Sequence, residues 1–127
     1  MENQRVKKAR KFFKTAKLLL ERGDYDSCIS RCYYALFHAT VAMLEKSGMS
    51  RAKWGHNFVL ASFNKEYIHR KKIFRSETGK SIHDIFEQRQ EADYSTDEKS
   101  FKKAKRVLDK TDAIFHSILK ELCDEKP

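Results

Sequence analysis

The fold is decided by residues 24–48, DYDSCISRCYYALFHATVAMLEKSG. Asp24, at the start of this stretch, is a good helix N-cap, and Gly48, at its end, is a good helix stop. Between these two residues, apolar side chains occur on nearly every side of a helix with 3.6 residues per turn. Because a helix that is apolar all round must be buried, the stretch predicts a central helix around which the rest of the chain packs.

The sequence on either side predicts further helices that would cover the central one. Before Gly23, apolar residues recur at spacings of three and four and predict an N-terminal helix. After a loop over residues 49–55, the pattern predicts a helix over 57–73 and then a break over 76–80. Two more helices follow, the first with apolar positions at Ile82, Ile85 and Phe86, the second at Phe101, Ala104, Leu108, Thr111, Phe115, Ile118 and Leu122.

Length and composition agree with this pattern. The 127 residues fall within the usual range of one domain and include only four glycines and one proline, which is the last residue. Because residues that break helices are so rare, the composition favours helix. Short connections make neighbouring helices antiparallel. We therefore expect an all-α fold, an up-and-down antiparallel four-helix bundle with an additional short helix, forming a single domain over residues 1–127.

Cysteine usage and hydropathy indicate the environment of the protein. Cys28, Cys32 and Cys123 are an odd set without the spacing of a zinc site, and the first two lie one helical turn apart, where both are expected in the core. No apolar run approaches the roughly 18 residues that a membrane-spanning helix needs. These features predict a cytoplasmic protein with no metal site, no cofactor and no membrane association.

Charge is distributed unevenly along the chain. The net charge is +9, and residues 1–22 hold eight Lys or Arg against two Glu, whereas residues 81–98 hold one Arg against six acidic residues. A basic surface of this kind can attract nucleic acid or an acidic protein. It can equally be a solvated helix face that keeps the protein dispersed, and the sequence leaves both interpretations open.

Polar residues interrupt two of the apolar patterns. On the central helix, a strip within roughly 100° of one another comprises Ser30, Arg31, Tyr34 and His38. In the helix that begins near Ile82, the apolar stripe continues onto Arg89 and Asp93. Because an unpaired buried charge costs several kcal/mol or more, Arg89 must be matched by Asp93 or by Tyr34 and His38, or must open onto a cleft.

Two interpretations of these residues remain open at this point. In the first, Arg89 bridges Asp93 and a tyrosine hydroxyl, and a nearby carbonyl satisfies His38, so that the group is an internal structural network. In the second, the residues line a cleft in which Arg89 holds a phosphate and His38 donates or accepts a proton. Phosphate-binding loops, nucleophile elbows and zinc-spaced histidine pairs are absent from the sequence.

The same residues resemble a known family. The run SRCYYALFHA over residues 30–39, then His56 after the loop, and then RQEADY over residues 89–94 are similar to the small stand-alone prokaryotic branch of the HEPN domain family. This resemblance spans most of the chain. It implies a helical bundle that is commonly dimeric and is often encoded beside a minimal nucleotidyltransferase, with which it forms a toxin and antitoxin pair.

The resemblance also implies a connection with nucleotides or RNA, since active members are metal-independent ribonucleases. Those members carry a histidine four to six residues after the arginine, where this chain has Tyr94, Ser95 and Thr96. An Arg-x6-His spacing does occur from Arg31 to His38, but on the central helix rather than at the position of the family motif. The catalytic histidine of the family is therefore missing from its expected place.

Three functions follow from these observations. The first is a non-catalytic module that acts as a homodimer with a minimal nucleotidyltransferase partner. It binds nucleotide or RNA through the basic segment of residues 1–22 and through Arg31, Tyr34, His38, His56, Arg89, Asp93 and Tyr94. The second is a ribonuclease that uses Arg89 with His38 or His56 in place of the missing histidine. The third is a purely structural bundle that associates with itself.

Overall fold

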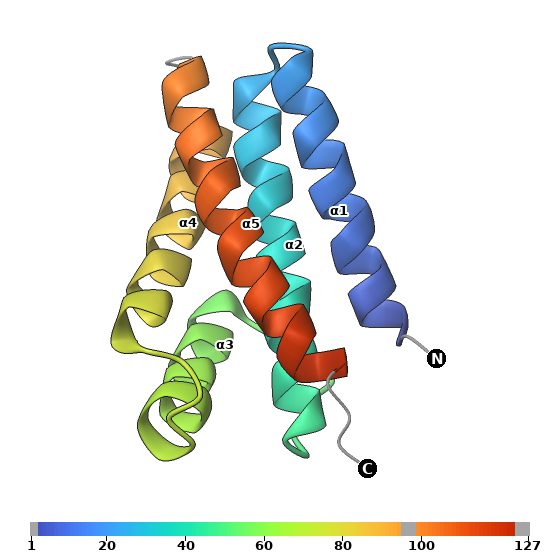
Figure 1. Ribbon diagram of the computed structural model, residues 1–127, viewed down its shortest axis with the longest axis vertical. Coiled ribbons are helices and arrows are strands. Elements are labelled where there is room, and N and C mark those ends of the chain that lie inside the picture. The colour runs from blue at the N-terminus through green and yellow to red at the C-terminus, as the bar shows by residue number, and fades with distance from the viewer. Residues whose placement is uncertain (1–2, 95–98, 124–127) are drawn as a thin grey trace.

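The computed structural model describes residues 3–94 and 99–123, and over these ranges it contains helices and no strand (Figure 1). The elements in chain order are α1 (Gln4–Glu21), α2 (Tyr25–Lys46), α3 (His56–Phe63), the π-helix η1 (Asn64–Arg70), α4 (Ser76–Tyr94) and α5 (Phe101–Cys123).

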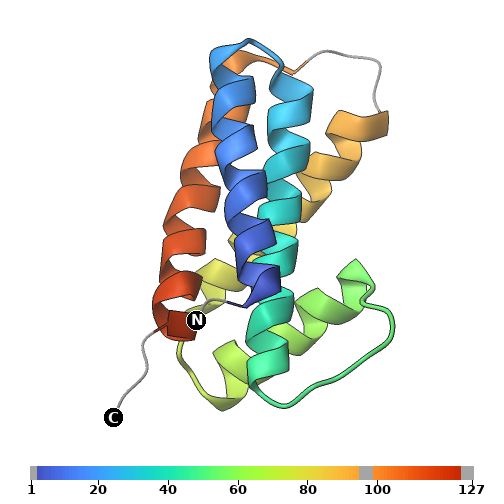
Figure 2. The ribbon, with the colours of Figure 1, turned by 90° about the vertical axis from the view of Figure 1, so that its right-hand side faces the viewer.

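Four long helices form an up-and-down bundle, and the shorter α3–η1 segment crosses one end of it (Figures 1 and 2). Helix α2 packs against α1, α3, α4 and α5, and is therefore the central helix. Figure 2 shows α1 beside α2, with α5 on one side of the pair and α4 on the other. The predicted all-α fold, four long helices with a short additional one, is confirmed.

Local signals explain where α1 and α2 begin. The side chain of Asn3 accepts a hydrogen bond from the Val6 amide at 2.8 Å, and Asp24 accepts one from the Ser27 amide at 3.4 Å. Between the two helices, Gly23 adopts a φ of 81°, a left-handed conformation that glycine enters without steric cost. The predicted cap at Asp24 is therefore confirmed, and the turn at Gly23 sets α1 antiparallel to α2.

The core lies around α2, as its apolar composition requires. Leu36 and Met43 are almost completely buried, and so are Phe13 on α1, Ile85 on α4 and Phe115 on α5. Each such side chain contributes about 1.5–3 kcal/mol through the apolar area that it removes from water. Truncating Leu36 to alanine would cost about 2–5 kcal/mol, because the packed surroundings cannot fully collapse into the space.

The predicted break over residues 76–80 is wrong, because α4 already begins at Ser76. The chain instead turns just before this helix, where Lys72 adopts a φ of 54°. Gly79 is buried where α4 meets η1, and a Cβ atom at this position would collide with the side chain of Asn64. The glycine therefore permits close packing between two helical segments, whereas in the sequence it suggested a loop. The helix predicted over 57–73 also ends earlier, at Arg70.

Candidate functional site

Arg89 lies on α4, one turn beyond the buried Phe86, and contacts two tyrosines of α2. Its Nη2 donates a hydrogen bond to Tyr34 Oη at 3.2 Å, and its guanidinium carbon lies 4.8 Å from the ring centre of Tyr33 and 5.6 Å from that of Tyr34. Cations over aromatic faces are attracted by the ring quadrupole. The partners of Arg89 on α2 are therefore two tyrosines. Tyr34 was one of the side chains that the sequence suggested for this role.

Asp93 completes the surroundings of the arginine from the next turn of α4. Its Oδ2 lies 2.9 Å from Arg89 Nε, an ion-pair distance, although Nε is not aligned for a hydrogen bond. The Arg89 side chain keeps 21% of its surface exposed and that of Asp93 30%. Desolvation opposes the charge of Arg89, but the hydrogen bond to Tyr34 and the negative charge of Asp93 raise its pKa above the ordinary value. Arg89 is therefore a fixed cation that still reaches solvent.

His38 lies one turn along α2 from Tyr34, but its partner is on α1 rather than α4. Arg5 Nη1 lies 3.1 Å from His38 Nδ1, and Arg5 Nε lies 2.9 Å from Glu45 Oε1. An arginine can only donate, so Nδ1 accepts and the ring proton is on Nε2. The expectation that a carbonyl satisfies His38 is therefore wrong, because a charged side chain 33 positions away in the sequence takes this place.

The environment of His38 keeps its ring neutral. Burial, with the positive charges of Arg5 and Lys8, lowers the pKa of His38 to about 4. The ring also stacks on Phe12, with a centre-to-centre distance of 5.6 Å and an interplanar angle of 3°. At neutral pH, His38 can therefore donate a hydrogen bond through Nε2, but it has no second ring proton to give as a general acid.

The remaining predicted residues are more widely spaced. His56 begins α3, and its ring meets Phe86 edge-on at 6.3 Å, while Phe86 in turn lies 4.8 Å from Tyr33. His56 thus borders the aromatic cluster that holds Arg89. Tyr94 ends α4 with 74% of its surface exposed. Ser95 and Thr96 lie outside the residues that the structure describes.

Arg31 opens onto a different part of the same helix face. Its guanidinium carbon lies 5.8 Å from the ring centre of Phe12, a residue of α1. A hollow of 340 Å³ beside it, between α1 and α2, is lined by Lys8, Lys11, Phe12, Thr15 and Arg31. A neighbouring hollow of 430 Å³ is lined by Asn3, Gln4, Arg5, Lys8, His38 and Glu45.

Phe12 was not among the residues predicted for the site, and Arg5 and Lys8 were predicted only as members of the basic N-terminal segment. Phe12 was assigned to the apolar stripe of the first helix, whereas its ring stacks at 5.4 Å on Tyr34 and is only half-buried. Its position at the edge of that stripe was the available signal. Arg5 and Lys8 are two of eight basic residues in the first 22, and nothing local distinguishes them.

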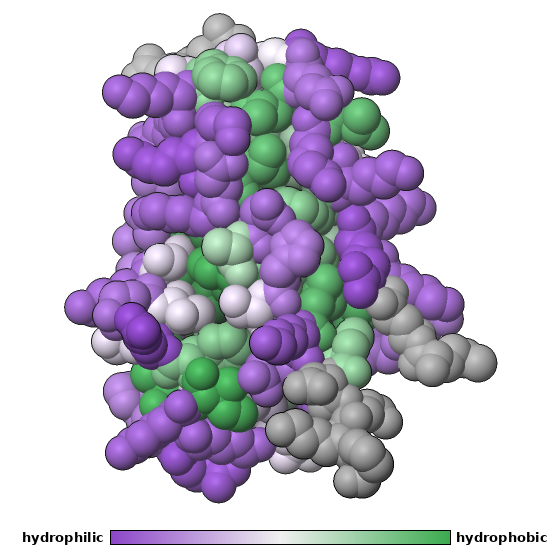
Figure 3. Space-filling view, viewed as in Figure 1, coloured by the Kyte–Doolittle hydropathy of each residue, from purple (hydrophilic) through white to green (hydrophobic). Residues whose placement is uncertain are grey.

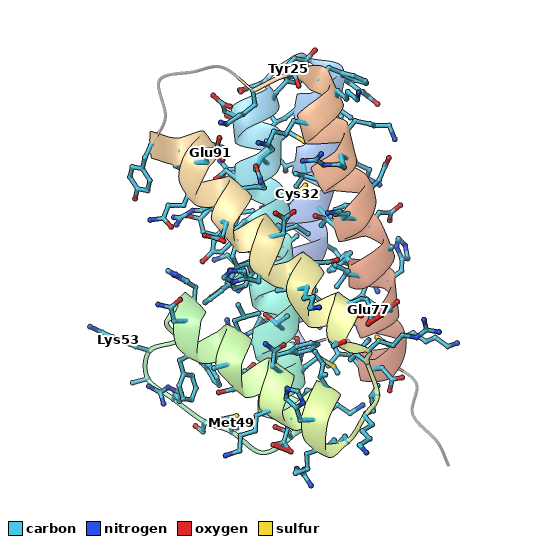
Figure 4. All side chains as sticks on the ribbon, turned by 90° about the vertical axis from the view of Figure 1, so that its left-hand side faces the viewer. Tyr25, Cys32, Met49, Lys53, Glu77 and Glu91 are labelled. Atoms are coloured by element: carbon cyan, nitrogen blue, oxygen red, sulfur yellow. The ribbon has the colours of Figure 1, made fainter. Side chains whose placement is uncertain are left out.

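Lysines at the start of α5 and along it have acidic neighbours on α4. Lys110 Nζ lies 3.4 Å from Asp84 Oδ2 on α4, and Lys99 and Lys103 lie 2.5 Å and 3.9 Å from Glu91 Oε1. Figure 4 shows the oblique course of α4 beside α5, with Glu91 in its upper half and Cys32 farther inside the bundle. Two carboxylates of the acidic segment thus lie within ion-pair distance of three of the lysines that follow it.

The described residues offer neither a metal-binding cluster nor a membrane-spanning helix. Among residues 3–94 and 99–123, no three His, Cys, Asp or Glu side chains come together in a group that could hold a metal ion. Cys28 and Cys32 are free thiols, both buried. Within the described part of the chain, no helix has the length and apolar character needed to cross a membrane.

Comparisons with known proteins relate the chain to a family. A family model described as HEPN domain matches residues 3–122. A UPF0332 protein of Thermotoga maritima is 40% identical over 88 residues, which are 69% of this chain and 64% of the relative. A UPF0332 protein of Archaeoglobus fulgidus is 50% identical over 40 residues, 32% of each chain.

A further relative carries a more informative name. The protein named "Putative toxin MJ0605", from Methanocaldococcus jannaschii, is 28% identical over 107 residues, which are 84% of this chain and 78% of the relative. By contrast, the chain spans just under two thirds of the Thermotoga protein and about one third of the Archaeoglobus protein.

Proposed function

The chain belongs to the HEPN domain family, and from that membership we propose that it is a nucleotide- or RNA-binding module of a toxin–antitoxin-type system. It acts with a minimal nucleotidyltransferase partner and forms a homodimer, as the family resemblance implies. The relative named "Putative toxin MJ0605" supports the toxin-like part of this proposal.

The observation that carries the binding role is the way Arg89 is held. Tyr34 Oη, the two tyrosine rings and Asp93 fix the guanidinium in one orientation, yet 21% of the side chain remains exposed. A pre-oriented guanidinium loses little rotational freedom when it binds, and its planar donors match the oxygens of a phosphate. Arg89 is thus suited to hold a phosphate group without further rearrangement.

Acid–base chemistry has weaker support at this arginine. The family's histidine position is occupied by Tyr94, Ser95 or Thr96, and His38 is held neutral by burial and by the positive charges of Arg5 and Lys8. Without a proton donor and acceptor, attack of a 2′-hydroxyl on the adjacent phosphate would lose roughly 10²–10⁴-fold in rate. Binding without cleavage requires none of these missing groups.

The proposal is tested with labelled total RNA, incubated with the purified protein with and without a chelator, and by fluorescence anisotropy on a labelled RNA. We expect intact RNA, measurable binding, and a loss of at least tenfold in affinity for Arg89→Ala. Arg106→Ala, which removes the same charge from an exposed position of α5, serves as the matched control and should bind within about twofold of wild type. Equal affinity of Arg89→Ala and wild type would contradict the proposal.

A ribonuclease remains the second candidate because His56 borders the aromatic cluster of Arg89 through Phe86. It predicts chelator-resistant cleavage that disappears in Arg89→Ala and in either His56→Ala or His38→Ala, with circular dichroism showing a retained fold. The position of His56 makes it the better histidine for this role, since His38 is neutral and paired with Arg5. If the protein neither binds nor cuts RNA, the remaining interpretation is the purely structural bundle.

A further inference from the structure

The hollow between α1 and α2 that lies beside Arg31 is lined by groups that suit an anion and by one aromatic ring. Its walls are the cations Lys8, Lys11 and Arg31, the hydroxyl of Thr15 and the ring of Phe12. No carboxylate lines it. At 340 Å³, it has room for a phosphate group together with part of the attached sugar or base.

The cations of this hollow also lack internal neutralisation. Within residues 3–94 and 99–123, no carboxylate lies within ion-pair distance of Lys8, Lys11 or Arg31. Three unpaired cations around one hollow produce a local positive potential that favours a polyanion.

An aromatic bridge connects the hollow with Arg89. Phe12 lines the hollow and stacks on Tyr34 at 5.4 Å with an interplanar angle of 29°, and Tyr34 Oη accepts the hydrogen bond from Arg89 Nη2. The hollow and Arg89 are therefore joined by two adjoining aromatic side chains. A ligand with a single phosphate can occupy only one of these positions, whereas a short polymer of phosphates can occupy both.

We propose that the hollow is a second phosphate-binding site, and that the ligand of this protein is a single-stranded RNA segment that reaches both the hollow and Arg89, rather than a mononucleotide. This inference rests on the proposed binding function and specifies its ligand. Lys8, Lys11 and Arg31 bind phosphodiester oxygens, and the half-buried ring of Phe12 packs against a sugar or base. Aromatic rings among the cations favour RNA over an acidic peptide, because bases stack on such rings.

The test compares labelled oligoadenylates of two, four, eight and sixteen nucleotides by fluorescence anisotropy over a range of salt concentrations. The variant Lys8→Gln, Lys11→Gln, Arg31→Gln removes the cations of the hollow. Its matched control, Lys102→Gln, Lys105→Gln, Arg106→Gln, likewise removes two lysines and one arginine, in this case from α5. Circular dichroism and thermal unfolding verify that both variants fold.

For the wild type, we expect affinity to rise from the dinucleotide to the octanucleotide, with AMP competing poorly. The hollow variant should bind the octanucleotide roughly 100-fold more weakly at 0.1 M salt, with the slope of log K against log salt smaller in magnitude by about 2. The α5 control should retain most of the affinity and slope.

Equal losses in the two triple variants would overturn the inference, because only general charge would then matter. Octanucleotide binding that is insensitive to the hollow variant but lost in Arg89→Ala would also overturn it, while leaving the proposed function intact. Competition by an oligoglutamate of equal charge as effective as that by the octanucleotide would assign the hollow to an acidic protein instead. If the wild type binds no oligonucleotide of any length, the inference and the proposed function fail together.

Discussion

The α1–α2 face and the α4–α5 face are both rich in lysine and arginine, yet the two faces differ in how many of these cations lie beside carboxylates. Lys99, just before α5, and Lys103 and Lys110 on α5 meet carboxylates of α4. On the α1–α2 face, the cations of the hollow have no such partners among the described residues, and aromatic rings lie between them. Figure 3 shows that hydrophilic side chains project along both edges of the face over α5, with patches of hydrophobic surface between them.

This difference shows that the charge of a sequence segment is not the charge of the surface it forms. Residues 81–98 carry six acidic residues, and α4 delivers two of them, Asp84 and Glu91, to the basic helix that follows. Helix α1 packs instead against the apolar and aromatic side of α2, which offers it few acids. The helix packed beside a basic segment therefore decides whether its field reaches the solvent.

The largest effect on RNA affinity should come from removing the acidic residues of the α4–α5 face, because the lysines there would then be unpaired like those of the α1–α2 face. Replacing Asp84 with Asn, Glu91 with Gln and Asp109 with Asn uncovers lysines that are now paired. We expect octanucleotide affinity at 0.1 M salt to rise roughly 10- to 100-fold and the salt dependence to steepen. A control that neutralises Glu66, Glu77 and Glu87, whose partners among the described residues are Arg70, Ser76 and His83 rather than lysines of α5, should raise affinity much less. No gain in the first variant would show that pairing does not suppress binding there.

The hydroxyl of Tyr34 offers the next test, because it connects the α1–α2 face with Arg89. Tyr34→Phe keeps the ring between Phe12 and Arg89 but leaves the guanidinium without its acceptor on α2. We expect a loss of about 1–3 kcal/mol in the free energy of unfolding, measured with urea. Tyr25→Phe is the matched control and should cost less than about 0.5 kcal/mol. A Tyr34→Phe variant as stable as wild type would mean that its hydroxyl does not hold Arg89.

A third prediction uses pH to detect the positive field of the α1–α2 face. Folding lowers the pKa of His38 to about 4, whereas the unfolded chain binds this proton near the ordinary value of about 6.5. The unfolded state therefore binds more protons between these values, so stability is present above pH 6.5 and is lost as pH falls toward 4. After allowance for solvent screening, we expect a loss of about 1–2 kcal/mol from pH 7 to pH 5.

Urea unfolding of His38→Gln and His116→Gln at the two pH values tests this expectation. The first variant should lose most of the pH dependence, and the second, which alters an exposed residue of α5, should retain it. The variant Arg5→Gln should raise the pKa of His38 in NMR titration, because a positive charge 3.1 Å from Nδ1 disappears. An unchanged titration in Arg5→Gln would remove Arg5 as a cause of the low pKa.

Much of the fold could be predicted because its signals are local. Helix α2 was evident from a capping aspartate, a terminal glycine and apolar residues on nearly every side. Local pattern failed at Gly79, since a glycine in a flexible loop and a glycine under close packing are the same letter in a sequence. Only the approach of Asn64 from η1 distinguishes them.

The candidate site, too, could be predicted from the sequence only where its signals are local. Tyr34 and Arg89 each interrupt an apolar stripe, and this conflict with burial made Tyr34 one of the side chains expected to match Arg89, as it does in the structure. The contact between Arg5 and His38 joins residues 33 positions apart and could not be chosen from eight similar cations.

The smallest predicted effect concerns the ion pairs that neutralise the α4–α5 face. A double-mutant cycle on Asp84→Asn and Lys110→Gln should give a coupling of about 0.2–1 kcal/mol in urea unfolding, decreasing with added salt, because both side chains are about 40% exposed. A coupling above about 2 kcal/mol would mean that these pairs hold α4 against α5. With a small coupling, the pairs matter mainly because their carboxylates reduce the positive field around the lysines of α5.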